Sequence, residues 1–235
     1  MSLYRYINQI LDVLLHGKPP ASVLSPELPI TFTRRVSQQL GMVYLPQGSL
    51  TSNVCLANVE EVRPAFRSSF TAGELLDYIY AAIQMMPITE KALVQDESLL
   101  KLVPKGDFLF WKWVALGSKI KEVHLSSSIG VDPQLFSFLE EGDNRVQTPA
   151  YRLDAANVLS PSSCPEGKVY INSRQYFGFV PEAVWRYKLL DVQPAHVWLT
   201  QRRGQQLSPE DILHYQKVLT KIYETNKLMQ QDRLQ

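Results

Sequence analysis

The final part of the sequence predicts a long helix that must pack along much of its length on other parts of the fold. It opens with "SPEDILHYQK", in which Ser208 is a favoured N-cap residue and Pro209 suits the first helical position. Downstream positions recur at alternating spacings of three and four residues, which is typical of a helix packed on another helix. These positions are Ile212, Tyr215, Leu219, Ile222, Asn226 and Met229. The chain therefore needs further elements to cover this face.

Three other segments carry the signals of helices. Ser2 can cap a first helix, and Thr71 with Glu74 forms a capping box at the start of a second. Residues 107–125 predict a third helix with a broad apolar face. The apolar stripe of the second helix consists of Leu75, Leu76, Ile79, Ala82 and Ile83, and that of the third of Phe110, Trp111, Val114, Ile120 and Val123.

Strands are expected in two regions of the chain. Residues 42–70 alternate β-branched and polar residues between Gly, Pro and Ser breaks. Residues 168–180 contain two strand-like pieces, followed by a short helix with Pro181 in its first turn. Residues 126–165 are polar and rich in turn residues, and "FTRRVSQQLG" is compatible with either a helix or a strand. This mixture of strands and helices predicts an α+β fold with a long C-terminal helix.

Length and composition bound the organisation of the chain. With 235 residues, 45% of them hydrophobic, it can bury a core without disulfide bonds. We expect residues 1–41 to form an N-terminal helix with a linker or arm, and residues 42–235 to form the main domain. Cys55 and Cys164 are expected to be free thiols. Polar residues interrupt the first helix, so it predicts neither a signal peptide nor a membrane span, and we expect a cytoplasmic protein.

The formal net charge is only +1, but it is unevenly distributed along the chain. Residues 1–70 hold 6 Lys and Arg against 4 Asp and Glu, residues 71–167 hold 8 against 13, and residues 168–235 hold 10 against 6. Phosphate contacts need local positive charge, so nucleic-acid contacts are expected at the two flanks. Residues 71–167, between these flanks, are then structural or contact a protein partner.

The sequence lacks the motifs of several enzyme classes. It contains no G-x-x-x-x-G-K-[ST] loop, no G-x-G-x-x-G turn and no Asn-Pro-Pro-Tyr tetrapeptide, so we expect neither a nucleotide cofactor nor methyl transfer. The histidines are far apart, so we expect no metal site; His124 should stabilise a helix C-terminus, and His214 lies beside the apolar seam of the last helix. Asp154, Glu166 and Lys168 follow the permissive order of a metal-dependent nuclease, although Glu166 is expected in a turn.

Arginine, asparagine and glutamine residues set among aromatic residues form the main candidate site. "YINSRQY" places three of them in a strand-like segment, and three more lie in a Gly-containing turn before the last helix. Such side chains read base edges in the major groove or contact phosphates, and Arg186 and Lys188 are expected to contact phosphates. Trp111 is expected in the core, whereas Trp185 and Trp198 fit either the core or base stacking. The candidate DNA-binding residues are Asn172, Arg174, Gln175, Arg186, Lys188, Arg202, Arg203 and Gln205.

Several strings resemble a known family. In chain order they are "ELLDYIYAAI", "FLFWKWVALGSKIKEVHL", "VYINSRQYFGFVPEAVW", "QPAHVWL" and "RRGQQLSPEDILHYQKVLTKIYET". They are similar to the C-terminal specificity domain of Type ISP restriction-modification enzymes, with coverage from about residue 50 to about residue 230. In that family a nuclease, a motor ATPase and an adenine methyltransferase precede this region, so the resemblance implies recognition of a DNA target without catalysis.

The leading hypothesis is sequence-specific binding of double-stranded DNA for a restriction-modification system, with no cofactor and no membrane partner. A separate methyltransferase or restriction polypeptide is a further partner that the sequence leaves open. One alternative is a protein-interaction subunit that docks on a methyltransferase, or on a second copy, through the last helix. The other is a metal-dependent nuclease built on Asp154, Glu166 and Lys168.

Overall fold

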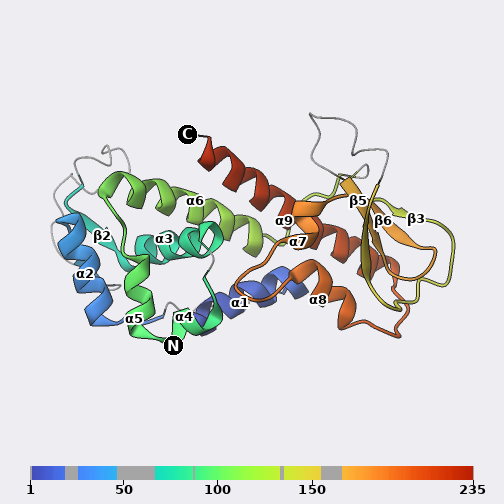
Figure 1. Ribbon diagram of the computed structural model, residues 1–235, viewed down its shortest axis with the longest axis horizontal. Helices are drawn as coiled ribbons and strands as arrows, with labels where there is room; N and C mark the ends of the chain where they lie inside the picture. The colour runs from blue at the N-terminus through green and yellow to red at the C-terminus, as the bar shows by residue number, and fades with distance from the viewer. Residues whose placement is uncertain are drawn as a thin grey trace. The chain divides into compact units, whose positions relative to one another are not determined.

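The computed structural model describes residues 2–18, 26–46, 67–86, 88–132, 135–154 and 166–234. These residues form two compact units (Figure 1). Unit 1 comprises the described residues of Met1–Ile10 and Pro20–Glu122, and unit 2 comprises those of Leu11–Pro19 and Val123–Gln235. The fold contains both helices and small sheets, which confirms the predicted α+β class. The predicted division between residues 41 and 42 stays a prediction.

Unit 1 is mainly helical. Its small sheet pairs β1 (Val43–Leu45) with β2 (Ser69–Thr71) in parallel. The segment compatible with helix or strand is helical, because Phe32, Thr33 and Val36 bury one face and Gly41 ends the helix with a left-handed φ of 64°. Its helices are α1 (Leu3–His16), which continues into unit 2, α2 (Ile30–Leu40), α3 (Ala72–Met85), α4 (Glu90–Val94), α5 (Asp96–Leu99), the 3₁₀ helix η3 (Leu100–Leu102) and α6 (Asp107–Leu125), which also continues into unit 2.

Capping fixes the predicted helix ends in unit 1. The hydroxyl of Thr71 accepts a hydrogen bond from the Glu74 N–H at 3.2 Å, and the Glu74 carboxylate accepts one from the Thr71 N–H at 2.7 Å. The Ser2 hydroxyl accepts a bond from the Arg5 N–H at 3.4 Å at the start of α1. The predicted stripe of α3 is buried throughout. The strand-like string "NVCLANVEEV" and both cysteines lie outside the described residues.

The apolar face of α6 follows the prediction only in part. Phe110, Trp111 and Ile120 are buried, whereas Val114 and Val123 are partly exposed. The sequence pattern missed the close approach of α6 to α3 at Gly117, where a Cβ would lie 1.8 Å from the carbonyl oxygen of Asp77. Glycine is required there because any side chain would collide with the backbone of α3.

Unit 2 contains a four-stranded antiparallel sheet in the order β3-β6-β5-β4 (Figure 1). Its strands are β3 (Phe138–Leu139), β4 (Ala150–Leu153), β5 (Glu166–Tyr170) and β6 (Tyr176–Pro181). Two of them, β3 and β4, lie in the segment predicted to consist of turns. That prediction was wrong because these strands are short and partly exposed, so their sequences carry little apolar alternation.

Three helices pack together beside this sheet, α7 (Glu182–Arg186), α8 (Pro194–Thr200) and α9 (Pro209–Arg233). Of these, α7 contacts β5 and β6, and α8 packs on α7 and α9. The ring of Phe177 on β6 meets that of Tyr215 on α9 at 4.7 Å between centroids, which packs the sheet on the last helix. Pro181 ends β6 and is the N-cap of α7, rather than part of its first turn as predicted. No helix among the described residues combines the length and apolarity that crossing a bilayer requires.

The last helix begins as predicted, with Ser208 as N-cap and Pro209 at its first position, and Asp211 completes a capping box. The buried side of the predicted seam consists of Tyr215, Leu219 and Ile222. Ile212, Asn226 and Met229 are only partly buried. The seam is therefore used for packing within unit 2 over its middle part.

A buried polar group joins α6 to α9. His124 is fully buried and its Nε2 lies 2.8 Å from the hydroxyl of Thr225, which itself donates to the carbonyl of Lys221 at 2.9 Å. Burial, reinforced by the nearby Lys221 ammonium, lowers the pKa of His124 to about 3. The imidazole is therefore neutral and does not supply the positive charge predicted for the end of α6. Lys221 does so instead, because its ammonium donates to the His124 carbonyl at 2.8 Å.

This arrangement predicts an acid-sensitive fold. In the unfolded chain a histidine protonates near its ordinary pKa of 6.5, but folded His124 resists protonation down to about 3. The stability from neutral His124 is thus complete above pH 6.5 and is lost as the pH falls toward 3, at about 1.4 kcal/mol per pH unit. Denaturant unfolding between pH 3 and pH 6.5 measures the free energy of unfolding of the wild type and of His124→Gln. This free energy should depend less steeply on pH in the variant. Equal slopes for the two proteins would contradict this assignment.

Candidate nucleic-acid interface

The turn between β5 and β6 carries three of the predicted site residues. Asn172, Arg174 and Gln175 were expected in a strand, but residues 171–175 form the turn of the hairpin. The reason is local: the Asn172 side-chain oxygen accepts hydrogen bonds from the N–H groups of Arg174 at 3.0 Å and Gln175 at 2.8 Å. Asparagine therefore closes the turn, and the Arg174 side chain is left exposed at its tip.

The Gln175 side chain is an internal cross-link, with the residue only 1% exposed. Its amide nitrogen donates to the Glu140 carbonyl at 3.2 Å and to the Asn144 side-chain oxygen at 2.7 Å. Its amide oxygen accepts from the Asn144 N–H at 2.9 Å and from the Asn172 amide at 3.0 Å. All four hydrogen-bonding positions of this amide have protein partners, so it holds the turn to the segment before β4.

Backbone hydrogen bonds bring a third segment to the same place. The Gln147 N–H donates to the Ile171 carbonyl at 2.7 Å, which joins the segment before β4 to the hairpin turn. The Val146 N–H donates to the Gln205 carbonyl at 2.9 Å, and the Gly204 N–H returns a bond to the Val146 carbonyl at 2.7 Å. We refer to residues 140–148, 171–175 and 202–207 together as the three-segment end of unit 2.

Long polar side chains project from the three-segment end. Arg174 and Gln205 are exposed. Arg145 donates to the Gly204 carbonyl at 2.7 Å, and Arg203 reaches the Thr148 hydroxyl at 3.4 Å. The exposed basic and amide residues of this end are Arg145, Gln147, Arg174, Arg203, Gln205 and Gln206. Sequence reasoning found three of these six residues.

The residues that it missed are Arg145, Gln147 and Gln206. Arg145 and Gln147 lie in "EEGDNRVQT", where the neighbouring acidic residues hid them from a search for local positive charge. Glu140, Glu141 and Asp143 are themselves exposed, so the three-segment end presents both charges. This mixture suits recognition of base edges, because carboxylates accept from cytosine whereas Arg and Gln match guanine and adenine.

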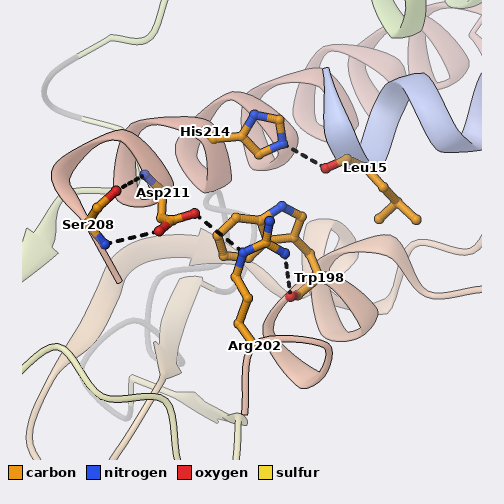
Figure 2. A network of polar contacts seen from close by, with 6 residues as sticks. All are labelled: Leu15, Trp198, Arg202, Ser208, Asp211 and His214. Atoms are coloured by element: carbon orange, nitrogen blue, oxygen red, sulfur yellow. Dashed lines mark hydrogen bonds and ion pairs between the residues drawn. The ribbon is translucent and has the colours of Figure 1, made fainter. Parts of the chain in front are cut away.

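Arg202 differs from its neighbour Arg203, because its guanidinium is held against the ring of Trp198 and beside Asp211 (Figure 2). It lies 3.6 Å from the ring centroid of Trp198, donates to the Trp198 carbonyl at 3.2 Å and pairs with Asp211 at 3.5 Å. Asp211 also caps α9 through Ser208, so Arg202 ties the turn to the start of the last helix. Trp198 is fully buried, which favours its core role over base stacking.

Two predicted phosphate contacts lie at the other end of the sheet. Arg186 on α7 pairs with Glu182 at 2.6 Å, and Lys188 follows that helix with an exposed side chain. The strand β6 runs from the hairpin turn at Tyr176 to Pro181, where α7 begins. At about 3.3 Å per residue this strand separates the two groups by roughly 20 Å. The structure therefore does not bring Arg186 and Lys188 to the three-segment end.

The nuclease-like residues also gather away from the hairpin turn. Glu166 is the first residue of β5 and not part of a turn, which corrects the prediction. Lys168 pairs with Asp154 at 3.5 Å, and the Asp154 N–H donates to the Glu166 carbonyl at 3.1 Å. Within the described ranges, no three His, Cys, Asp or Glu side chains form a group that could hold a metal ion. Asp154, Glu166 and Lys168 do line one small pocket together, and Lys168 pairs with Asp154 there.

Comparisons with known proteins place the chain in a family. Two solved structures are similar: the cryoEM structure of a DrdV–DNA complex, with 17% identity and a TM-score of 0.47, and a nuclease-deletion mutant of the Type ISP restriction-modification enzyme LlaGI in complex with a DNA substrate mimic, with 16% identity and a TM-score of 0.39. The matches cover 69% and 68% of this chain, which spans only 18% and 13% of those two chains. No curated protein matches the chain. The Type ISP C-terminal specificity domain matches residues 31–231, and the chain therefore belongs to that family.

Proposed function

We propose that this chain recognises a double-stranded DNA sequence for a restriction-modification enzyme, and that the three-segment end makes the contacts. The observation that carries this proposal is the convergence of three separate segments, through the Gln175 amide and the Val146 backbone, into one rigid edge with exposed Arg and Gln side chains. Membership of a specificity-domain family supports the functional class. The family concerns recognition, so we assign no catalytic step to these residues.

The hairpin supplies a suitable shape for this role. The major groove of B-DNA is about 12 Å wide. The β5–β6 hairpin is flanked by β3 and β4 in the four-stranded sheet, so its turn, where Arg174 is exposed, is the part that would enter the groove. Inserted by its turn, the hairpin would direct Arg174 toward base edges, while Gln205 and Gln147 approach from the adjoining segments. Arg145 and Arg203 would then lie at the sides of the groove, where phosphates run.

The predicted residues divide into two roles on this proposal. Arg174 and Gln205 would read bases, and Arg203 would contact a phosphate. Asn172, Gln175 and Arg202 would hold these residues in place, because their side chains already bond within the protein. Arg186 and Lys188 stay predicted phosphate contacts for a duplex long enough to run along the sheet.

Docking through the last helix is less well supported. Leu219 and Ile222, two of the apolar residues on the predicted seam of the last helix, are fully buried within this chain. Ile212 and Met229 are partly exposed, which leaves a smaller apolar face than the sequence predicts. A separate methyltransferase or restriction polypeptide is the partner that we propose for a complete enzyme.

Selection of randomised duplex DNA tests the base readers directly. We expect the wild type to enrich a motif, and Arg174→Ala and Gln205→Ala each to relax it at a particular base pair, with a loss of about 1–3 kcal/mol of discrimination there. The matched control is Lys188→Ala, which removes an exposed cation from the other end of the sheet and should keep the motif. If Lys188→Ala relaxes the motif while Arg174→Ala and Gln205→Ala keep it, the proposed site is wrong.

Gln175 should behave differently from the readers. Gln175→Ala leaves the Asn144 N–H and the Glu140 carbonyl without a buried partner, so we expect the free energy of unfolding to fall by about 2 kcal/mol or more. Arg174→Ala should change that free energy by less than about 0.5 kcal/mol, because its side chain is exposed. Denaturant unfolding of both variants measures the difference. Equal free energies of unfolding for the two variants would show that the Gln175 side chain does not stabilise the fold.

A further inference from the structure

Unit 2 contains a small cavity whose lining includes no residue of the three-segment end. It lies between the end of α1, the residues that follow α6 and one face of α9, and its volume is about 110 Å³. Two lysines, two histidines and two serine hydroxyls supply its polar surface, and no carboxylate is among its described lining residues. The lining consists of Leu14, His16, Gly17, Ser126, Ser127, His214, Lys217, Val218 and Lys221.

The cations of this cavity come mainly from α9. His214, Lys217 and Lys221 follow helical spacing and so lie on one face of the helix. Lys221 is 3% exposed and donates to the His124 carbonyl, and the Nε2 of His214 lies 2.6 Å from the Leu15 carbonyl (Figure 2). Neither of these two side chains has a carboxylate partner among the described residues.

The remaining cation, Lys217, has no hydrogen bond or ion pair within the described part of the chain. His16 at the end of α1 pairs with Asp12 at 3.5 Å, but the aspartate is itself exposed and does not line the cavity. The positive charge inside the cavity is therefore not balanced by a negative group of its lining.

The titration of the lining groups reports the same excess of positive charge. Burial and then repulsion from Lys217 lower the pKa of Lys221 to about 8. The pKa of His214 is also lowered, first by burial and in addition by the charges of Arg202, Lys221 and His16. A bound anion would relieve this repulsion and would be strengthened by the low local dielectric.

We propose that this cavity binds a small tetrahedral oxyanion between Lys217 and Lys221, with the hydroxyls of Ser126 and Ser127 as further donors. The volume of about 110 Å³ is more than three times the share of one liquid water, which is about 30 Å³, so it has room for such an ion. The chemistry is that of a phosphate group, either free inorganic phosphate or a phosphodiester of DNA. The site stands apart from the base readers and does not depend on the proposed function.

Calorimetric titration with inorganic phosphate, in a buffer that contains no other oxyanion, tests the site on the full chain. We expect phosphate to bind the wild type and Lys217→Gln to weaken its affinity about tenfold, the effect of removing one charge-assisted hydrogen bond. The control Lys227→Gln removes an exposed lysine from the same helix, one that pairs with Glu224 outside the cavity, and should leave the affinity unchanged.

NMR of the imidazole of His214 supplies a second readout, which does not depend on the heat of binding that calorimetry measures. Phosphate in the cavity should raise the pKa of His214, because a negative charge then lies beside the ring. No binding to the wild type, or equal affinity of Lys217→Gln and Lys227→Gln with no response of His214, would overturn the proposal. Unchanged unfolding free energies of the two variants ensure that a loss of binding is not a loss of fold.

A competition arm identifies the source of the oxyanion. Duplex DNA that displaces bound phosphate from the wild type supports a phosphodiester in the cavity. Simultaneous binding of phosphate and DNA supports a free anion. Both results confirm the oxyanion site. Because phosphate binding is measured without DNA, its failure is distinct from a failure of DNA recognition.

Discussion

The buried amide of Gln175 is the interaction on which the candidate interface depends. Three of the four hydrogen bonds of this side chain join the hairpin turn to the segment before β4, and that segment in turn bonds to the turn before α9. Without these bonds, three loops would each lose conformational entropy on binding a ligand. With them, that entropy is already lost during folding, and Arg174 and Gln205 lie on a preorganised edge.

A second anchor fixes the same edge to the helical layer. Arg202 stacks on Trp198 and pairs with Asp211, which also caps α9. The guanidinium thus links the end of α8 with the start of the longest helix of the chain, just beside the exposed Arg203. Adjacent arginines have different tasks here: one keeps the turn in place and the other is available to a partner. Interfaces that read DNA need such a rigid support behind their contact residues.

The helices could be predicted from the sequence because their signals are local. Thr71 with Glu74 and Ser208 with Pro209 mark helix starts within four residues of sequence, and the structure confirms both. The sheet was harder, since β3 and β4 are defined by partners far along the chain. The burial of Gln175 could not be predicted either, because two of its partners, Glu140 and Asn144, lie more than thirty residues earlier.

On the proposed function, the three-segment end is the surface that meets DNA. Hydrogen–deuterium exchange of the chain, with and without a duplex taken from the selected pool, measures this for every segment at once. We expect added protection within residues 140–148, 171–175 and 202–207, and none in α2 or α4 of unit 1. Protection confined to other segments, with these three unchanged in the presence of bound duplex, would contradict it.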